Sequence, residues 1–167
     1  QSPAPTLYEQ QTQFTGHDGA VYAAAFSPKG DLIASGGYDK LVMIWNPDEI
    51  KPIDIGDELD GTAEADTNHT TLSGHSGPVR SVAFSPNGQL LLSGSEDNAL
   101  RVWDVVKGES VKALRGHGSG VRTCTFSPDG QWILSGGQDE KIRVWDLQGY
   151  QETRVLHSTV FTGHLDA

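Results

Sequence analysis

The sequence predicts an all-β protein built from repeated four-stranded antiparallel sheets. A twelve-residue pattern occurs three times, and each copy holds four short β-prone segments within about 42 residues. No stretch shows the periodicity of an amphipathic helix. The three copies of the pattern are SGGYDKLVMIWN at 35–46, SGSEDNALRVWD at 93–104 and SGGQDEKIRVWD at 135–146.

Each copy stands at a fixed distance from an upstream Gly-His pair. The histidine precedes the tryptophan by 28 residues in every copy: His17 to Trp45, His75 to Trp103 and His117 to Trp145. A fourth Gly-His pair occurs at 163–164. Fixed internal spacing in three copies indicates a structural repeat, because a chance similarity would not preserve it.

The strands of the second copy follow from its residue types. β-Prone residues span 79–85, 89–95, 99–105 and 110–116, with Ser-Pro-Asn-Gly closing the first segment. Proline presets φ at the second turn position, and the glycine two residues later relaxes the backbone. These four segments are predicted to form one antiparallel sheet.

The first strand of each copy departs from strict alternation. Val79 and Val82 are three residues apart, whereas Val82 and Phe84 are two apart. One extra residue in a period-two strand predicts a β-bulge. Cys124 occupies the slot of Val82 in the third copy, which predicts a small buried side chain and not a reactive thiol.

Composition limits the function classes. The 167 residues carry a net charge of −10, which argues against binding nucleic acid through phosphate contacts. No apolar run is long enough to cross a membrane. The single cysteine favours a reducing compartment such as the cytoplasm and excludes an internal disulfide. No cofactor is predicted.

Most of the acidity lies in one connection, at about 46–70. This segment holds eight acidic residues and one lysine, a net charge of −7. Its DIGDELDG stretch lacks a second carboxylate in register for Ca²⁺, so no metal site is predicted. The segment is predicted to be a solvated insertion between strands.

The repeated residues resemble the WD-repeat family of β-propellers. The resemblance implies four-stranded blades arranged around a central channel. It divides the chain into a linker or cut segment at 1–7, the outer strand of a preceding or closing blade at 8–15, blades at 16–73, 74–115 and 116–162, and the start of a further blade at 163–167. Two interpretations stay open: a piece of a longer propeller, or copies that self-associate to close a ring.

The resemblance also implies a buried hydrogen-bonded tetrad in each blade. The tetrads would be His17–Ser35–Asp39–Trp45, His75–Ser93–Asp97–Trp103 and His117–Ser135–Asp139–Trp145. A buried Trp N–H and Ser hydroxyl need partners, and an imidazole with a carboxylate behind it supplies them. Three equivalent sets argue against a Ser–His–Asp hydrolase, so no catalytic residue is predicted.

Similarity to this family predicts a non-catalytic scaffold that binds a protein or peptide over the channel mouth. The residues implied at that face are Tyr22, Tyr38, Lys40, Arg80, Glu96, Asn98, Arg122, Gln138 and Glu140. Tyr22, Arg80 and Arg122 are the strongest candidates, because Tyr and Arg dominate binding hot spots. The alternative is a regulatory module of a larger signalling protein, a kinase or ATPase, whose catalytic part lies outside this chain.

Overall fold

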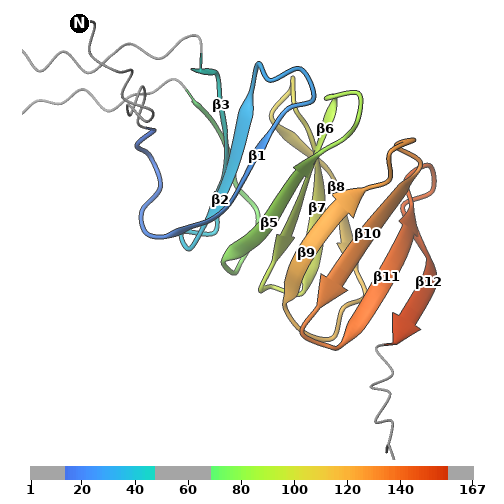
Figure 1. Ribbon diagram of the computed structural model, residues 1–167. Helices are drawn as coiled ribbons and strands as arrows, with labels where there is room; N and C mark the ends of the chain where they lie inside the picture. Colours follow the sequence, from blue (N-terminus) through green and yellow to red (C-terminus); the bar gives the residue numbers. More distant parts are fainter. Residues whose placement is uncertain (1–13, 48–68, 158–167) are drawn as a thin grey trace, which may run out of the picture.

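The computed structural model describes residues 14–47 and 69–157. They form three sheets, each with four antiparallel strands in sequence order (Figure 1). These described residues contain no α-helix, and hence no helix long and apolar enough to cross a membrane. The predicted all-β class with four-stranded antiparallel sheets is confirmed.

Each predicted repeat contains one sheet. The first has β1 (Val21–Phe26), β2 (Ile33–Gly37), β3 (Val42–Trp45) and β4 (His69–Leu72). The second has β5 (Val79–Phe84), β6 (Leu90–Ser95), β7 (Ala99–Asp104) and β8 (Glu109–Arg115). The third has β9 (Val121–Phe126), β10 (Trp132–Gly137), β11 (Lys141–Asp146) and β12 (Gln151–His157).

Several predicted segments fall partly or wholly outside the described residues. These are the linker at 1–7, most of the strand at 8–15, the start of a further blade at 163–167 and most of the acidic insertion. One boundary differs from the prediction: β4 begins at His69, so the last two residues of the predicted insertion belong to a strand. They pair with β3, where Trp45 lies opposite His69.

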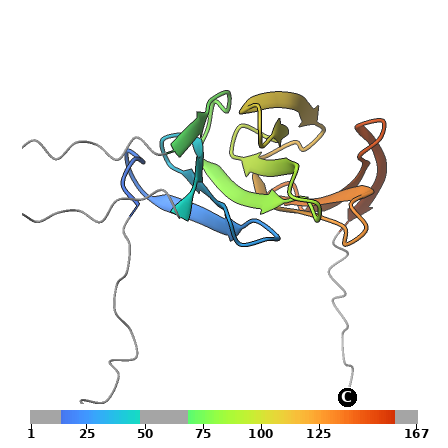
Figure 2. The same ribbon diagram turned by 90° about the horizontal axis from the view of Figure 1, so that it is seen from above.

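The three sheets stand side by side, with β5 in contact with both β1 and β9 (Figure 2). Two apolar clusters fill the spaces between neighbouring sheets. Between the first and second sheets, Val42 and Leu72 pack with Val79 and Trp103. Between the second and third, the cluster contains Cys124, and burial raises the pKa of its thiol to about 12. The predicted burial of this cysteine is confirmed.

A β-bulge occurs in the first strand of every sheet, as the spacing predicts. Val79 pairs with Ser95 and Ser81 pairs with Gly94, which leaves Arg80 as the extra residue. The register shifts in the same way around Tyr22 in β1 and around Arg122 in β9. A bulge strengthens the local twist and re-aims side chains. The three strongest candidates for partner binding are therefore the three bulge residues.

Candidate functional site

The predicted tetrad residues of the second sheet are joined by hydrogen bonds. Trp103 Nε1 donates to Ser93 Oγ at 2.8 Å, and Ser93 Oγ lies 2.8 Å from His75 Nε2. His75 Nδ1 lies 2.8 Å from Asp97 Oδ2. An ionised carboxylate only accepts, so Nδ1 carries the proton and Nε2 accepts from the serine hydroxyl. Each of these tetrad atoms therefore has a hydrogen-bond partner.

The other two sheets repeat the arrangement. In the first sheet, Ser35 Oγ lies 2.8 Å from Trp45 Nε1 and 2.7 Å from His17 Nε2. In the third, Ser135 Oγ lies 2.9 Å from the tryptophan nitrogen and 2.8 Å from the imidazole. The carboxylates of Asp39 and Asp139 complete these chains at 2.8 Å from the imidazole Nδ1.

Each tetrad carboxylate also ties two loops together. Asp97 accepts from the amide of Ser76, beside the Gly-His pair, and from the amide of Ala99, at the start of β7. Burial alone would raise the pKa of this carboxyl, but hydrogen bonds from His75 and from those amides hold it well below its ordinary value of 3.8. The pKa of the Asp139 carboxyl depends on the same two opposing effects. Burial opposes its ionisation, yet bonds from the Gly118 amide and His117 lower its pKa to about 2.

The Asp97 and Asp139 carboxylates are expected to make the folded chain sensitive to acid. Their pKa is lower in the folded chain than in the unfolded chain, so their stabilising contribution is present above about pH 4 and is lost as the pH falls through the folded value. Between about pH 5 and pH 2, Asp139 alone is expected to lose about 2 kcal/mol of unfolding free energy. Urea denaturation from pH 6 to pH 2 measures it. Asp139→Asn should flatten this dependence; an unchanged slope would contradict the assignment.

The tetrad serines are closed to substrates. Ser93 is 0% exposed and Ser135 is 1% exposed, and each oxygen is bonded on one side to a tryptophan and on the other to a histidine. A catalytic nucleophile needs access to the group it attacks. This geometry suits internal support of a sheet.

The bulge residues meet their neighbours along one edge of the array. We call it the tetrad edge: the starts of β1, β5 and β9 with the turns before β3, β7 and β11. The Arg80 guanidinium lies 3.7 Å over the ring of Tyr22, from the neighbouring sheet. Arg80 also donates to Glu96 Oε1, from Nε at 2.8 Å and Nη2 at 2.7 Å. A guanidinium stacked on a ring and paired with a carboxylate is held in one orientation.

Glu96 links the second and third sheets. The oxygen that accepts from Arg80 also accepts from Arg122 Nη1, at 3.0 Å. The Gln138 amide oxygen, oriented to satisfy both side chains, accepts from Arg122 Nε at 3.1 Å and from its Nη2. A continuous row therefore runs from Tyr22 to Gln138 across all three sheets.

Two arginines sharing one glutamate leave the row with one positive charge, and its members are not fully buried. The two guanidinium groups lie near each other, as their equivalent positions predict, but both already donate hydrogen bonds to Glu96. The remaining predicted residues lie in the adjoining turns. Tyr38 is 59% exposed, and three residues hold positive φ angles: Lys40, Asn98 and Glu140.

Backbone bonds hold these turns against the first strands. The amides of Tyr38, Glu96 and Gln138 donate to the carbonyls of Ala20, Pro78 and Gly120 at 2.8 to 2.9 Å. The candidate side chains thus project from a hydrogen-bonded frame. Such a frame limits the conformational entropy lost when a partner binds.

One supporting residue is absent from the sequence-based predictions. Arg101 Nη2 donates to the Gly74 carbonyl at 2.7 Å, and its guanidinium lies 5.8 Å from the Trp103 ring. It therefore clamps the loop that precedes His75. The sequence does carry a signal for it, because an arginine stands two residues before Trp in two copies, with Met43 at this place in the other.

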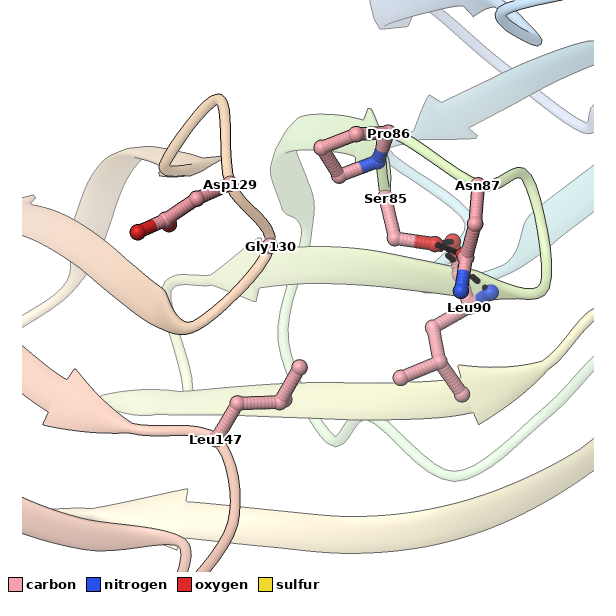
Figure 3. A pocket seen from close by; sticks show the side chains of 7 residues that line it. All are labelled: Ser85, Pro86, Asn87, Leu90, Asp129, Gly130 and Leu147. Carbon is pink, nitrogen blue, oxygen red and sulfur yellow. Dashed lines mark hydrogen bonds between the residues drawn. The ribbon is translucent and has the colours of Figure 1, made fainter.

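A small hollow of about 120 Å³ lies at the opposite edge, between the Ser-Pro-x-Gly turns of the second and third sheets. Pro86, Leu90 and Leu147 are among its lining residues, and the Asp129 carboxylate points away from Pro86 (Figure 3). That carboxylate is hydrogen-bonded within its own turn, to Ser127 and the Gln131 amide. The other polar lining residues, Ser85 and Asn87, hydrogen-bond each other at 2.7 Å, so the polar side chains of the hollow are paired within their own turns and do not converge on a ligand.

Metal ligation finds no support in the part of the chain that the structure describes. Within it, no three His, Cys, Asp or Glu side chains gather to hold an ion. The DIGDELDG stretch lies outside that part.

Comparison with known proteins places the three repeats in one family. The family model for the WD domain, G-beta repeat, matches residues 8–46, 67–104 and 108–146. The small ribosomal subunit protein RACK1 of Dictyostelium discoideum is 40% identical over 67% of this chain and 32% of its own length. A chromatin assembly factor 1 subunit of Gallus gallus is 35% identical over 65% of this chain and 20% of its own length.

A third relative and a solved structure are also similar to this chain. The U5 small nuclear ribonucleoprotein 40 kDa protein of Dictyostelium discoideum is 30% identical over 62% of this chain and 25% of its own length. The solved structure of U3-55K superposes on 88% of this chain and 42% of its own with a TM-score of 0.74; at 18% identity this shows the fold alone. The chain therefore spans about a third or less of the length of each of these three curated relatives.

Proposed function

Since this chain belongs to the WD-repeat family, we propose that it is a non-catalytic interaction module that binds a peptide or protein segment across the tetrad edge. The observation that carries the proposal is the row Tyr22–Arg80–Glu96–Arg122–Gln138. Three of its five members are bulge residues from three different sheets. A partner lying on this row would touch every sheet of the array.

The chemistry of the row supports this proposal. Aromatic and arginine side chains with little freedom are the residue types that dominate binding hot spots. The row is partly exposed, so a partner could bury it and strengthen its ion pairs. The relatives' names describe a ribosomal subunit protein, a chromatin assembly factor subunit and a ribonucleoprotein component, which are parts of larger assemblies.

A displayed library of random peptides, selected on the immobilised chain, tests the proposal. Selected peptides are expected to bind Arg80→Glu/Arg122→Glu at least about tenfold more weakly than the unchanged chain, as measured by fluorescence anisotropy. Lys107→Glu/Lys112→Glu is the matched control, because it makes the same change in net charge at exposed lysines outside the row. Equal binding to both variants would place the binding surface elsewhere.

A further inference from the structure

Glu96 lies at the centre of the row that crosses the tetrad edge. Three arginine nitrogens converge on one of its carboxylate oxygens, Oε1: Arg80 Nε at 2.8 Å, Arg80 Nη2 at 2.7 Å and Arg122 Nη1 at 3.0 Å. The two arginines belong to the second and third sheets, and the carboxylate comes from the turn before β7. Converging guanidinium N–H groups suit a single anionic oxygen. Here a carboxylate of the same chain occupies that position.

Each guanidinium group has a second support, which carries no charge. The Arg80 guanidinium lies 3.7 Å over the ring of Tyr22, and Arg122 Nε donates to the Gln138 amide oxygen at 3.1 Å. Neither support involves Glu96. The two cationic groups are therefore expected to keep their places when the Glu96 carboxylate moves away.

The Glu96 carboxylate is held less firmly than the arginines. The Glu96 backbone is fixed, because its amide donates to the Pro78 carbonyl at 2.9 Å. Its carboxylate, however, bonds only the two arginines among the described residues, and the side chain is 30% exposed. Partly exposed ion pairs contribute little free energy, because water solvates the separated charges. Exchange of this carboxylate for another one should therefore cost little.

The charges of the row favour an anionic ligand. Arg80 and Arg122 supply two positive charges and Glu96 supplies one negative charge, so one positive charge is not balanced within the row. The arginine side chains are 25% and 42% exposed, which leaves part of each guanidinium group open to a ligand. Most of the net charge of −10 lies outside the row, in the acidic connection at about 46–70.

We propose that the tetrad edge recognises an acidic peptide, whose Asp or Glu carboxylate takes the place of the Glu96 carboxylate between Arg80 and Arg122. This inference deepens the proposed function and rests on it. The ligand group is a carboxylate, because a carboxylate already meets three arginine nitrogens at hydrogen-bond distance there. Glu96 then competes with the ligand from within the same chain and lowers its affinity.

Peptides selected from a displayed random library on the unchanged chain test the inference. Each selected peptide is made in two versions for fluorescence anisotropy, one with its acidic residue and one with the corresponding amide, Gln or Asn. The amide version is expected to bind at least about tenfold more weakly. Arg122→Gln should bind both versions alike. Lys112→Gln is the matched control, at an exposed lysine of β8, and should keep the tenfold difference.

Glu96→Gln separates competition from structural support. Removal of the competing carboxylate is expected to strengthen binding of the acidic peptide at least about threefold. Glu109→Gln makes the same change in net charge at an exposed glutamate of β8 and should change the affinity by less than about twofold. A glutamate that served only to hold the arginines would give weaker or unchanged binding when replaced. Should near-ultraviolet circular dichroism show that Glu96→Gln is misfolded, Glu96→Ala replaces it.

The inference is overturned if the selected peptides lack acidic residues, if the acid and amide versions bind alike, or if Glu96→Gln binds no more tightly than Glu109→Gln. A phosphoserine version completes the series: if it alone binds, the site takes a phosphoryl group and the carboxylate assignment is wrong. Peptides that need no acidic residue but are lost in Arg80→Glu/Arg122→Glu would leave the proposed function standing. Peptides that this variant still binds would contradict both.

Discussion

Ser93→Ala is expected to lower the free energy of unfolding by about 2–4 kcal/mol, because it leaves two buried groups without a partner. The Ser93 hydroxyl oxygen lies 2.8 Å from both Trp103 Nε1 and His75 Nε2, and the serine is 0% exposed. An apolar methyl group can neither accept from the indole nor donate to the imidazole. Urea denaturation at neutral pH measures the loss.

Ser110→Ala is the control for this change, since Ser110 is exposed on β8. It should alter the unfolding free energy by less than about 0.5 kcal/mol. A cycle that combines Ser93→Ala with Trp103→Phe should show a coupling of about 1–2 kcal/mol. A loss below about 0.5 kcal/mol for Ser93→Ala, or additive effects in the cycle, would contradict the structural role of the tetrad.

Gly94→Ala is expected to destabilise the chain by about 1–3 kcal/mol, because the new methyl group would occupy the space of Val121. Its β-carbon would lie 2.8 Å from Val121 Cγ1 and 3.6 Å from Cys124 Sγ, both in the neighbouring sheet. Either the valine leaves its position or the two sheets separate. Thermal and urea denaturation report the change.

Gly136→Ala is the matched control, at the same position of the third sheet. Its β-carbon would meet only Thr123 Cγ2 of the same sheet, at 3.0 Å. The reduced freedom of the unfolded chain offsets part of that crowding, so a change below about 1 kcal/mol is expected. Equal losses in Gly94→Ala and Gly136→Ala would mean that packing between sheets does not set the cost.

The repeated motif predicts most of what lies within one sheet. Strands, turns and the four tetrad positions recur at fixed spacing, and the interval between Val79, Val82 and Phe84 indicates the bulge. These features depend on local backbone geometry and on residues of one repeat. The sequence therefore predicts these features well, because each copy repeats the same strands, turns and hydrogen bonds.

Contacts between sheets are harder to predict. Arg80 and Arg122 are recognisable as equivalents, but the sequence does not reveal that Glu96 reaches both. That contact depends on how closely neighbouring sheets pack. The packing distance depends on contacts such as the one between Gly94 of the second sheet and Val121 of the third. The sequence also does not reveal which residue of a turn accepts the hydrogen bond of its serine. Ser27 bonds Asp31, whereas the equivalent Ser85 bonds Asn87, which stands two residues earlier in its turn.

Amide chemical-shift mapping of the ¹⁵N-labelled chain with a selected peptide shows whether partners bind the tetrad edge. The largest shifts are expected at Tyr22, Arg80, Arg122 and the turn amides of Glu96 and Gln138. Shifts confined to the opposite edge, around Pro86 and Leu147, would contradict it.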